Sequence, residues 1–260
     1  GNGADSGHVR IYEYNGSSWT QLGSDIDGEG AGDRFGGSVT LSSDGTIVAI
    51  GATKNDGGGT DSGHVRIYGY NGSSWSQLGA DIDGSGAGES FGKAISLSSD
   101  GTIAAIGAQG VDGLKSGLVR VYEYNGSSWS QLGVDIDSEG EGDRFGGPVS
   151  LSSDGTILAT GGVQNDGGGS NSGHVRIYKY SGGSWTQLGS DIDGEAAGDY
   201  LGFSVSLSSD GTIVAIGAIY NDGNGTDSGY ARIYEYDGSS WSQIGSDING
   251  EAASDYSGWS

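Results

Sequence analysis

The sequence predicts an all-β protein, a β-propeller of four-stranded antiparallel blades, about five in number with one incomplete half blade. Two observations carry this prediction. A Ser-Gly pair recurs before a strand-like run, and each repeat holds four short strand-like runs separated by turn residues. The serines are Ser6, Ser62, Ser116, Ser172 and Ser228, so the repeats are 56, 54, 56 and 56 residues apart. No segment combines a helical period with capping residues.

Each repeat begins with a predicted hairpin. In one repeat, residues 94–101 alternate apolar and small polar side chains before a turn, and residues 102–108 are mostly apolar. Blades stack on both faces, which explains why the second run does not alternate. Asp-Gly marks the tight turn in every complete repeat, at Asp44, Asp100, Asp154 and Asp210.

A second hairpin completes the repeat. Residues 118–124 form the predicted third strand, and residues 129–136 form the fourth, outer strand. Turn residues between them are Asn15, Asn71, Asn125, Ser181 and Asp237, each followed by glycine. A β-solenoid is the competing architecture, although its coils are usually shorter and contain fewer hairpin turns.

We expect a single repeat domain over residues 1–260. Its parts are a half blade with third and fourth strands (1–28), four blades (38–84, 93–138, 148–194 and 203–250) and a lead-in to a missing strand (251–260). Because the chain contains no methionine, we expect a processed product, a fragment or part of something longer. The half blade leaves an unpaired strand edge, which favours pairing with another chain.

The composition of the chain limits the classes of partner that it is expected to bind. The chain carries 34 acidic and 11 basic residues, a formal net charge of −23, so we expect it to repel nucleic acid and anionic membranes. No apolar run is long enough to cross a membrane, so we expect no membrane insertion. The absence of cysteine removes disulfides and thiol chemistry.

The unit resembles the FG-GAP repeat of the integrin alpha-subunit propeller and of related secreted proteins. The residues that carry the resemblance are Phe35-Gly36 with Gly51-Ala52, Phe91-Gly92 with Gly107-Ala108, and Phe145-Gly146 with Gly161-Gly162, with Leu201-Gly202 before Gly217-Ala218 as a departure. The resemblance implies a propeller and an extracellular or cell-surface location. The family's proline is absent, since Thr53, Gln109, Val163 and Ile219 stand at its position. Its calcium loop is also absent, because "SSDGT" offers one carboxylate and reads as a plain hairpin.

The acidic loops after the fourth strand are the candidate metal sites, with calcium as the candidate cofactor. Oxygen atoms at alternating positions beside glycine suit a hard cation. The alternative is structural: these carboxylates satisfy turn donors or pair with the repeated arginines. The candidate ligands are Asp25, Asp27, Asp81, Asp83, Asp135, Asp137, Asp191 and Asp193.

An arginine occupies the same mid-strand position in every repeat, and we expect it to form a structural ion pair, with anion binding as the alternative. These residues are Arg10, Arg66, Arg120, Arg176 and Arg232. His8, His64 and His174 share a position with Leu118 and Tyr230. Leucine neither binds a metal nor transfers a proton, so we interpret these histidines as packing residues.

A tryptophan begins the fourth strand of every repeat, and tyrosines crowd the third strand. Aromatic rings beside polar groups suit neutral sugars, whereas packing between blades is the structural alternative and the one we favour. The candidate sugar-binding residues are Trp19, Trp75, Trp129, Trp185 and Trp241.

Four asparagines fit the N-glycosylation pattern, and three of them occupy the same exposed turn. They are Asn15, Asn71, Asn125 and Asn224. Glycosylation is expected if the chain is secreted by a eukaryote; otherwise Asn-Gly is simply turn chemistry.

The expected function is a non-enzymatic extracellular scaffold or adhesion module that assembles with itself, head to tail or through its edge strand. The alternative is a multivalent lectin that binds neutral glycans between blades. An enzyme in the central channel is disfavoured, because near-identical repeats offer symmetry where catalysis needs a distinct set of groups. We therefore predict no catalytic residues.

Overall fold

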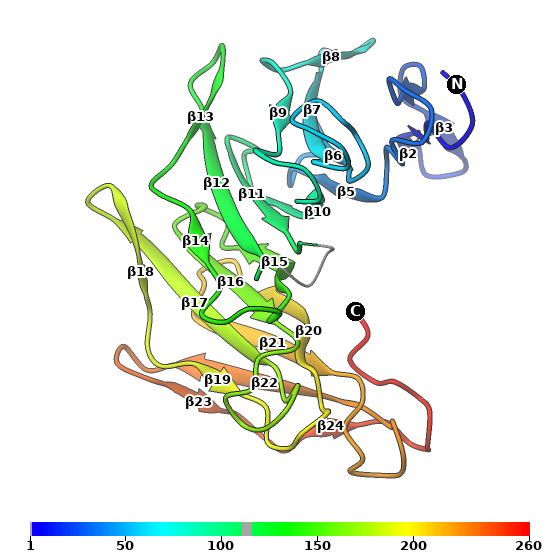
Figure 1. Cartoon of the computed structure of the whole chain (residues 1–260). Coiled ribbons are helices and arrows are strands. Elements are labelled where there is room, and N and C mark those ends of the chain that lie inside the picture. The colour runs from blue at the N-terminus through cyan, green and yellow to red at the C-terminus, as the bar shows by residue number, and fades with distance from the viewer. Residues whose placement is uncertain (1, 111–115) are drawn as a thin grey trace.

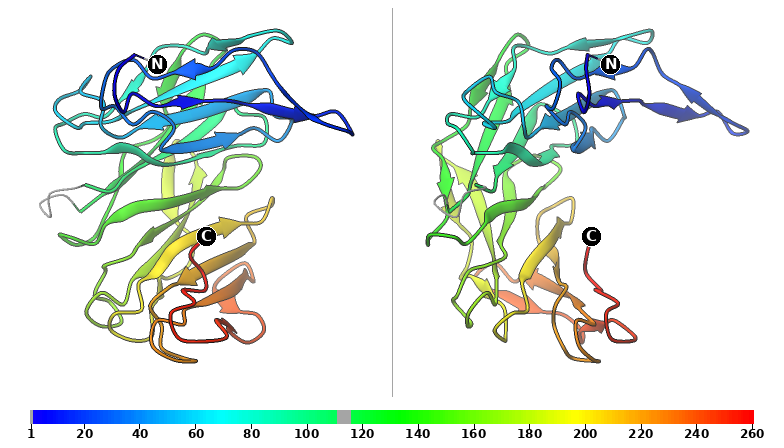
Figure 2. Two further views of the ribbon diagram at one scale, coloured as in Figure 1. Left: turned by 90° about the vertical axis from the view of Figure 1, so that its right-hand side faces the viewer. Right: turned by 45° about the vertical axis from the view of Figure 1, so that its right-hand side comes forward.

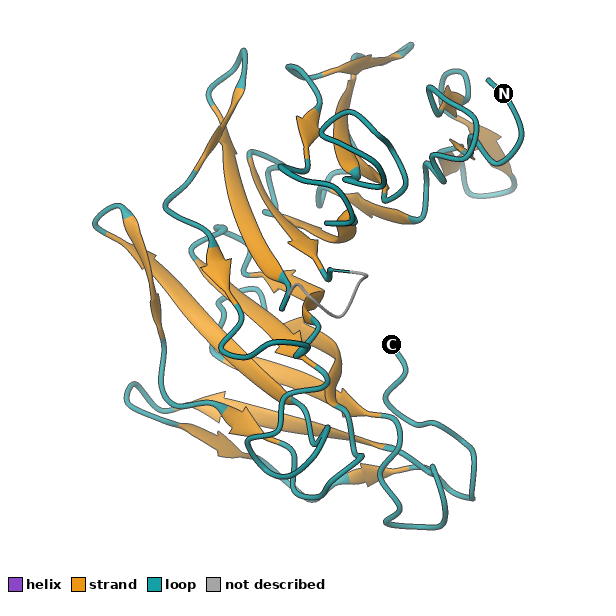
Figure 3. Ribbon diagram, in the orientation of Figure 1, coloured by secondary structure: helices purple, strands orange, loops and turns teal. Residues whose placement is uncertain are grey.

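The computed structural model describes residues 2–110 and 116–260, and the described chain is built from strands and loops (Figures 1 and 3). Residues 111–115 of the second complete blade lie outside the described ranges. The all-β propeller architecture is confirmed: four antiparallel sheets follow one another along an arc, preceded by a half blade. Among the described residues, no helix could span a membrane.

The half blade contains β1 (His8–Val9) paired with β4 (Ile26–Asp27), and β2 (Tyr12–Tyr14) paired with β3 (Trp19–Gln21). Blade 1 contains β5 (Ser38–Leu41), β6 (Ile47–Ala52), β7 (His64–Tyr70), β8 (Trp75–Gln77) and β9 (Ile82–Asp83). Blade 2 contains β10 (Phe91–Leu97), β11 (Ile103–Ala108), β12 (Leu118–Tyr124), β13 (Trp129–Gln131) and β14 (Ile136–Asp137).

Blade 3 contains β15 (Phe145–Leu151), β16 (Ile157–Gly162), β17 (His174–Ser181), β18 (Ser184–Gln187) and β19 (Ile192–Asp193). Blade 4 contains β20 (Leu201–Leu207), β21 (Ile213–Ala218), β22 (Tyr230–Tyr236), β23 (Trp241–Gln243) and β24 (Ile248–Asn249). The first strands β5, β10, β15 and β20 lie along the inner side of the arc, and the hairpins ending in β8, β13, β18 and β23 project outward (Figure 1).

The fourth strand was predicted as one continuous segment, and the structure differs from this prediction. In each full blade it is divided into two short strands, both paired with the third strand, such as β8 and β9 on β7. Between them Gly79 has φ 75°, a left-handed conformation that bends the chain away from the ladder. The inner strands also begin earlier than predicted, at Phe91, Phe145 and Leu201.

The core lies between blades rather than within them. Ala49 and Ile67 of blade 1 pack with Phe91 and Ile106 of blade 2 in one buried cluster. The paired glycines of the FG-GAP pattern explain the close approach of adjacent blades: a Cβ on Gly107 would overlap the carbonyl of Gly146. These positions therefore require glycine because backbone faces backbone across the interface.

Candidate functional site

Each complete blade has one of the repeated arginines, and that arginine contacts carboxylates from two segments of the chain. Arg232 binds Asp247 of its own blade at 2.7 Å and Glu195 of the preceding loop at 2.8 Å. Arg66 likewise contacts Asp81 and Glu29. The expected structural pairing of the arginines is therefore present. We call this arrangement the arginine clamp; it links neighbouring repeats through charge-assisted hydrogen bonds.

The first aspartate of each predicted metal loop belongs to such an ion pair. Arg10 and Gln21 donate to Asp25, and these hydrogen bonds lower the pKa of its carboxyl to about 2. The equivalents Asp81, Asp135 and Asp191 also accept from an arginine and a glutamine. The second aspartates of the loops, Asp27, Asp83, Asp137 and Asp193, are exposed. Calcium binding by these eight residues stays a prediction.

Two acidic clusters include a buried histidine. Glu139, His174 and Asp191 form one, and Glu29, His64 and Asp81 form its equivalent. His174 is fully buried, and its Nδ1 lies 3.7 Å from Asp191. Neither ring nitrogen has a hydrogen-bond partner among the described residues. Burial lowers the pKa of the His174 imidazole. The guanidinium of Arg176 contacts both carboxylates of its cluster, so a metal ion would have to displace that charge.

The tryptophans of the four complete blades connect neighbouring repeats. The indole N–H of Trp75 donates to the Leu22 carbonyl at 2.9 Å, and Trp129 donates to Leu78 at 2.8 Å. Trp185 and Trp241 make the same bond to Leu132 and Leu188. Packing between blades is thus their visible role. Trp19, in the half blade, has no such acceptor among the described residues and is 69% exposed.

Hollows lie beside two of these tryptophans. One of about 330 Å³ is lined by Trp75 and Tyr68 on one side and by Asp25 and Asp27 on the other. Its equivalent, of about 250 Å³, is lined by Trp129, Tyr122, Asp81 and Asp83. Both contain aromatic rings and hydrogen-bond acceptors.

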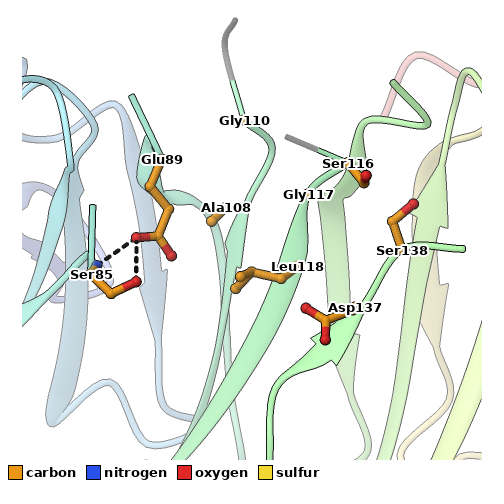
Figure 4. Close-up of a pocket in the computed structure, with 9 residues that line it drawn as sticks. All are labelled: Ser85, Glu89, Ala108, Gly110, Ser116, Gly117, Leu118, Asp137 and Ser138. Carbon is orange, nitrogen blue, oxygen red and sulfur yellow. Dashed lines mark hydrogen bonds between the residues drawn. The ribbon is translucent and has the colours of Figure 1, made fainter. Parts of the chain in front are cut away.

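A different pocket, of about 320 Å³, lies where the repeat changes its sequence (Figure 4). Ser85 and Ser138 stand where the other repeats have glutamate and glycine, and Leu118 stands where three repeats have histidine and the last has Tyr230. The backbone N–H and the hydroxyl of Ser85 both donate to Glu89, which also binds Arg120 at 2.7 Å. Ser116, Asp137 and Ser138 also line the pocket with polar side chains.

Two adjoining cavities of about 260 and 370 Å³ lie along the inner strands. They share Lys93, Gln109 and Arg144, and the larger one adds Tyr200 and Phe203. Sequence reasoning missed this site because it followed residues that recur. The sequence does contain a signal for this site: the lining positions are ones whose residue type changes from repeat to repeat.

The glycosylation candidates are exposed. The side-chain oxygen of Asn15 accepts from the backbone N–H groups of Ser17 and Ser18, so it also organises the hairpin. The amide of Asn224 donates to the Gly250 carbonyl at 3.0 Å. Glycosylation at Asn15, Asn71, Asn125 and Asn224 stays a prediction, as does the extracellular location.

Comparison with known proteins supports the repeat assignment. The sequence model of the FG-GAP repeat matches residues 25–68 and 191–234, so the chain carries FG-GAP repeats, as the resemblance implied. No curated protein matches the sequence.

Solved structures share the fold at low identity. The periplasmic gluconolactonase PpgL of Pseudomonas aeruginosa is 16% identical with a TM-score of 0.59, covering 92% of this chain and 63% of that one. KlAtg21, solved in complex with the coiled coil of AgAtg16, is 14% identical with a TM-score of 0.60, covering 92% and 65%. A protein provisionally titled a 6-phosphogluconolactonase, from Bacteroides uniformis, is 13% identical with a TM-score of 0.56, covering 90% and 65%. The chain thus spans less than two thirds of these relatives.

The prediction that the chain is not an enzyme requires correction. It depended on the symmetry of the repeats, yet structures with this fold carry the name gluconolactonase. The inner-strand cavities are moreover lined by residues that differ between repeats. Identity of 13–16% establishes the fold and transfers no substrate to this chain.

Proposed function

We propose that the protein is an assembling propeller module in which the half blade of one copy docks onto blade 4 of a second copy, head to tail. One observation carries this proposal: a contact that recurs at every internal blade junction is left open, in complementary halves, at the two ends of the arc. The proposed partner is therefore a second copy of this chain.

The tryptophan contact shows this complementarity. At the internal junctions a tryptophan ring lies 2.9–3.1 Å from the position a Cβ would take on Gly23, Gly79, Gly133 or Gly189. At Gly245, the equivalent glycine of blade 4, nothing lies within 4 Å of that position. Trp19 is the exposed indole at the opposite end. A second copy would place Trp19 over Gly245 and give it the Ile244 carbonyl as acceptor.

The arginine clamp is open in the same way. Arg10 pairs with Asp25 at 2.8 Å, but its side chain is 48% exposed and no preceding loop in the described chain supplies a glutamate. Glu251 occupies the glutamate position after blade 4 and has no ion pair among the described residues. Opposite charges thus face outward at opposite ends, which suits head-to-tail contact.

Exposed apolar side chains also lie at the two ends of the arc. Ile26, Ile82, Ile136 and Ile192 are 6–7% exposed, whereas their equivalent in blade 4, Ile248, is 55% exposed. In the half blade and blade 1, Tyr12, Val39 and Leu41 are 46–47% exposed. Exposed apolar area of this kind marks interaction sites.

Sedimentation velocity over a wide range of protein concentration tests the proposal. The wild type is expected to form dimers and longer species, whereas Trp19→Ala shifts the equilibrium toward monomer. Glu251→Arg weakens assembly by opposing Arg10, and the double variant Arg10→Glu with Glu251→Arg restores it. Val134→Ala is the matched control, since Val134 is 75% exposed in the loop that follows β13. A wild type that stays monomeric throughout contradicts the proposal.

We also propose a second function, a lectin for neutral glycans, on the basis of the two hollows beside Trp75 and Trp129. Each combines a tryptophan and a tyrosine with two aspartates, an arrangement that stacks on a sugar face and accepts hydrogen bonds from its hydroxyls. Recurrence of the hollow supports multivalent binding.

A glycan array with the wild type and Asp83→Ala separates this function from structural packing. Asp83 lines one hollow, is exposed and is outside the arginine clamp, so its replacement is expected to weaken binding without unfolding the chain. Asp56→Ala is the control, because Asp56 is exposed but lines neither hollow. Absence of binding to every neutral glycan contradicts the lectin proposal.

A further inference from the structure

The repeats lose their symmetry along one rim of the inner strands. Three positions of the repeat are involved: a left-handed residue at the start of the repeat, the third residue after it, and the second residue after the second strand. The first position holds Arg34, Ser90, Arg144, Tyr200 and Tyr256; the second holds Gly37, Lys93, Gly147, Phe203 and Trp259; the third holds Lys54, Gly110, Gln164 and Tyr220. The early repeats therefore supply cations, and the late repeats supply aromatic rings.

These positions meet in the two adjoining cavities. The cavity of about 260 Å³ is lined by Arg34, Lys54, Lys93 and Arg144 among others. The cavity of about 370 Å³ continues from Lys93 and Arg144 to the aromatic side chains. Together they form one groove, the rim groove, that is cationic at one end and aromatic at the other. Their volumes fall in or near the range of small-molecule sites.

The cations of the rim groove are unusual in so acidic a chain. The whole sequence has 11 basic residues against 34 acidic ones, and four of the basic residues line this groove. Arg34, Lys93 and Arg144 form no ion pair with any described residue, in contrast to the arginine clamps. Lys54 binds Asp61 at 2.8 Å. Three positive charges that pair with no described carboxylate lie at one site and repel one another, and a bound anion relieves that repulsion.

The aromatic end can hold a ring. Tyr200 and Tyr220 meet edge to face, with ring centroids 5.1 Å apart, and Phe203 lines the same cavity. The hydroxyls of Tyr200 and Tyr220 have no hydrogen-bond partner among the described residues, and the Gln109 amide lines the cavity beside them. Apolar ring faces next to free hydroxyl and amide groups suit a sugar, which needs stacking and hydrogen bonds together.

We propose that the rim groove binds an anionic sugar, a pyranose-sized ring that bears a carboxylate or a phosphate. Lys93 and Arg144 bind the anionic group by charge-assisted hydrogen bonds. Tyr200, Phe203 and Tyr220 contact the sugar ring, and Gln109 with the tyrosine hydroxyls binds its hydroxyl groups. The site is separate from the ends of the arc and from the hollows beside Trp75 and Trp129.

Isothermal titration with defined probes tests this assignment. The probes are galacturonate and glucose 6-phosphate, with glucose, inorganic phosphate and AMP for comparison. At least one of the two anionic sugars is expected to bind, and to bind more tightly than glucose or inorganic phosphate. The preferred one of the two then distinguishes a carboxylate ligand from a phosphate ligand. Binding is expected to weaken as NaCl is raised, because Lys93 and Arg144 are exposed.

Matched variants locate the site. Lys93→Gln and Arg144→Gln are each expected to weaken binding about tenfold, the effect of losing one charge-assisted hydrogen bond, and Phe203→Ala weakens binding by removing ring contact. Lys179→Gln is the control, since it changes the net charge equally from an exposed position on β17.

Several results overturn the assignment: neither anionic sugar binds, inorganic phosphate binds as tightly as glucose 6-phosphate, AMP binds more tightly than both sugars, or Lys179→Gln loses as much affinity as Lys93→Gln. Circular dichroism of each variant separates a lost contact from a lost fold.

Discussion

At the scale of single residues, one exchange preserves the arginine clamp where the repeat departs from its own pattern. The loop before blade 2 carries Ser85 instead of the clamp glutamate, and Glu89 instead of an aspartate. The side chain of Glu89 is one methylene longer, and it reaches Arg120 Nη1 at 2.7 Å while accepting from the backbone of Ser85. Two substitutions thus keep one buried charge paired, which is required because an unpaired buried arginine is strongly destabilising.

His174 illustrates the opposite situation, a buried polar group without a hydrogen-bond partner in the described part of the chain. Its ring packs edge to face on Phe145, with centroids 6.1 Å apart, and lies close to the backbone of Gly162. Burial lowers the pKa of both His174 and His64. The equivalent residue in blade 2 is Leu118, so the position accepts an apolar side chain.

We predict that His174→Leu removes part of the acid sensitivity of the fold. A histidine whose folded pKa lies below its ordinary value of 6.5 stays neutral in the folded state, while the unfolded chain takes up a proton first. Stability is therefore unaffected above that value and falls as the pH drops below it. The melting temperature of the wild type should fall between about pH 7 and pH 5, and that of the variant should fall less.

His8→Leu is the control for this prediction, because His8 is exposed at the equivalent position of the half blade. Thermal unfolding followed by circular dichroism at several pH values gives the comparison. Equal acid sensitivity in the wild type and in His174→Leu would contradict the role given to the buried imidazole.

At the scale of elements, the "SSDGT" turn is a self-contained unit rather than a cation loop. Asp44 accepts from the Ser42 hydroxyl at 2.7 Å and from the backbone N–H of Thr46 at 2.9 Å, and Gly45 has φ 71°. In the equivalent turn, such hydrogen bonds lower the pKa of Asp210 to about 2. The carboxylate is occupied by the hairpin itself, which agrees with the plain turn inferred from the sequence.

Regular elements were therefore predictable, because they depend on residues that recur. The Asp-Gly hairpins, the apolar second strand and the ion pairs of the repeated arginines could all be inferred from one repeat and applied to the others. The division of the fourth strand was not predicted, because it follows from the left-handed conformation of Gly79 and its equivalents rather than from the pattern of apolar and polar side chains.

The rim groove was beyond prediction for a related reason. Its lining residues, such as Lys93, Arg144 and Phe203, come from different blades and differ in chemistry. A description by repeats treats such positions as variable surface. Only the placement of three inner strands side by side shows that the cations and the rings share one cavity.

At the scale of the whole molecule, the arc consists of stacked blades that each contact only their neighbours. In such arrays stability comes from the repeats and from the interfaces between them. The end blades lack one interface each within the described chain, which agrees with the exposure of Trp19 and Ile248. Curvature and end structure are thus consequences of the same contacts that hold the interior together.

Net charge acts on the same whole-molecule scale and gives the last prediction. The formal charge of −23 leaves many carboxylates without partners, so self-repulsion should destabilise the fold at low salt. Raising NaCl to about 0.15 M shortens the screening length to about 8 Å. We expect the melting temperature to rise by a few degrees. The half-buried arginine clamps are screened less and lose little.

Comparison of NaCl with CaCl₂ at equal ionic strength then tests the acidic loops. Screening alone raises the melting temperature equally in the two salts, whereas calcium bound between Asp27 or its equivalents and a second oxygen ligand stabilises the folded state by mass action. An additional rise in CaCl₂ that EDTA reverses would support calcium sites in these loops. Identical melting curves in the two salts would contradict calcium binding. The carboxylates of the loops would then act only through charge repulsion and through pairing with arginine. A melting temperature that falls when NaCl is added would contradict the prediction from net charge. It would show that the arginine clamps stabilise the fold by more than the repulsion between carboxylates destabilises it.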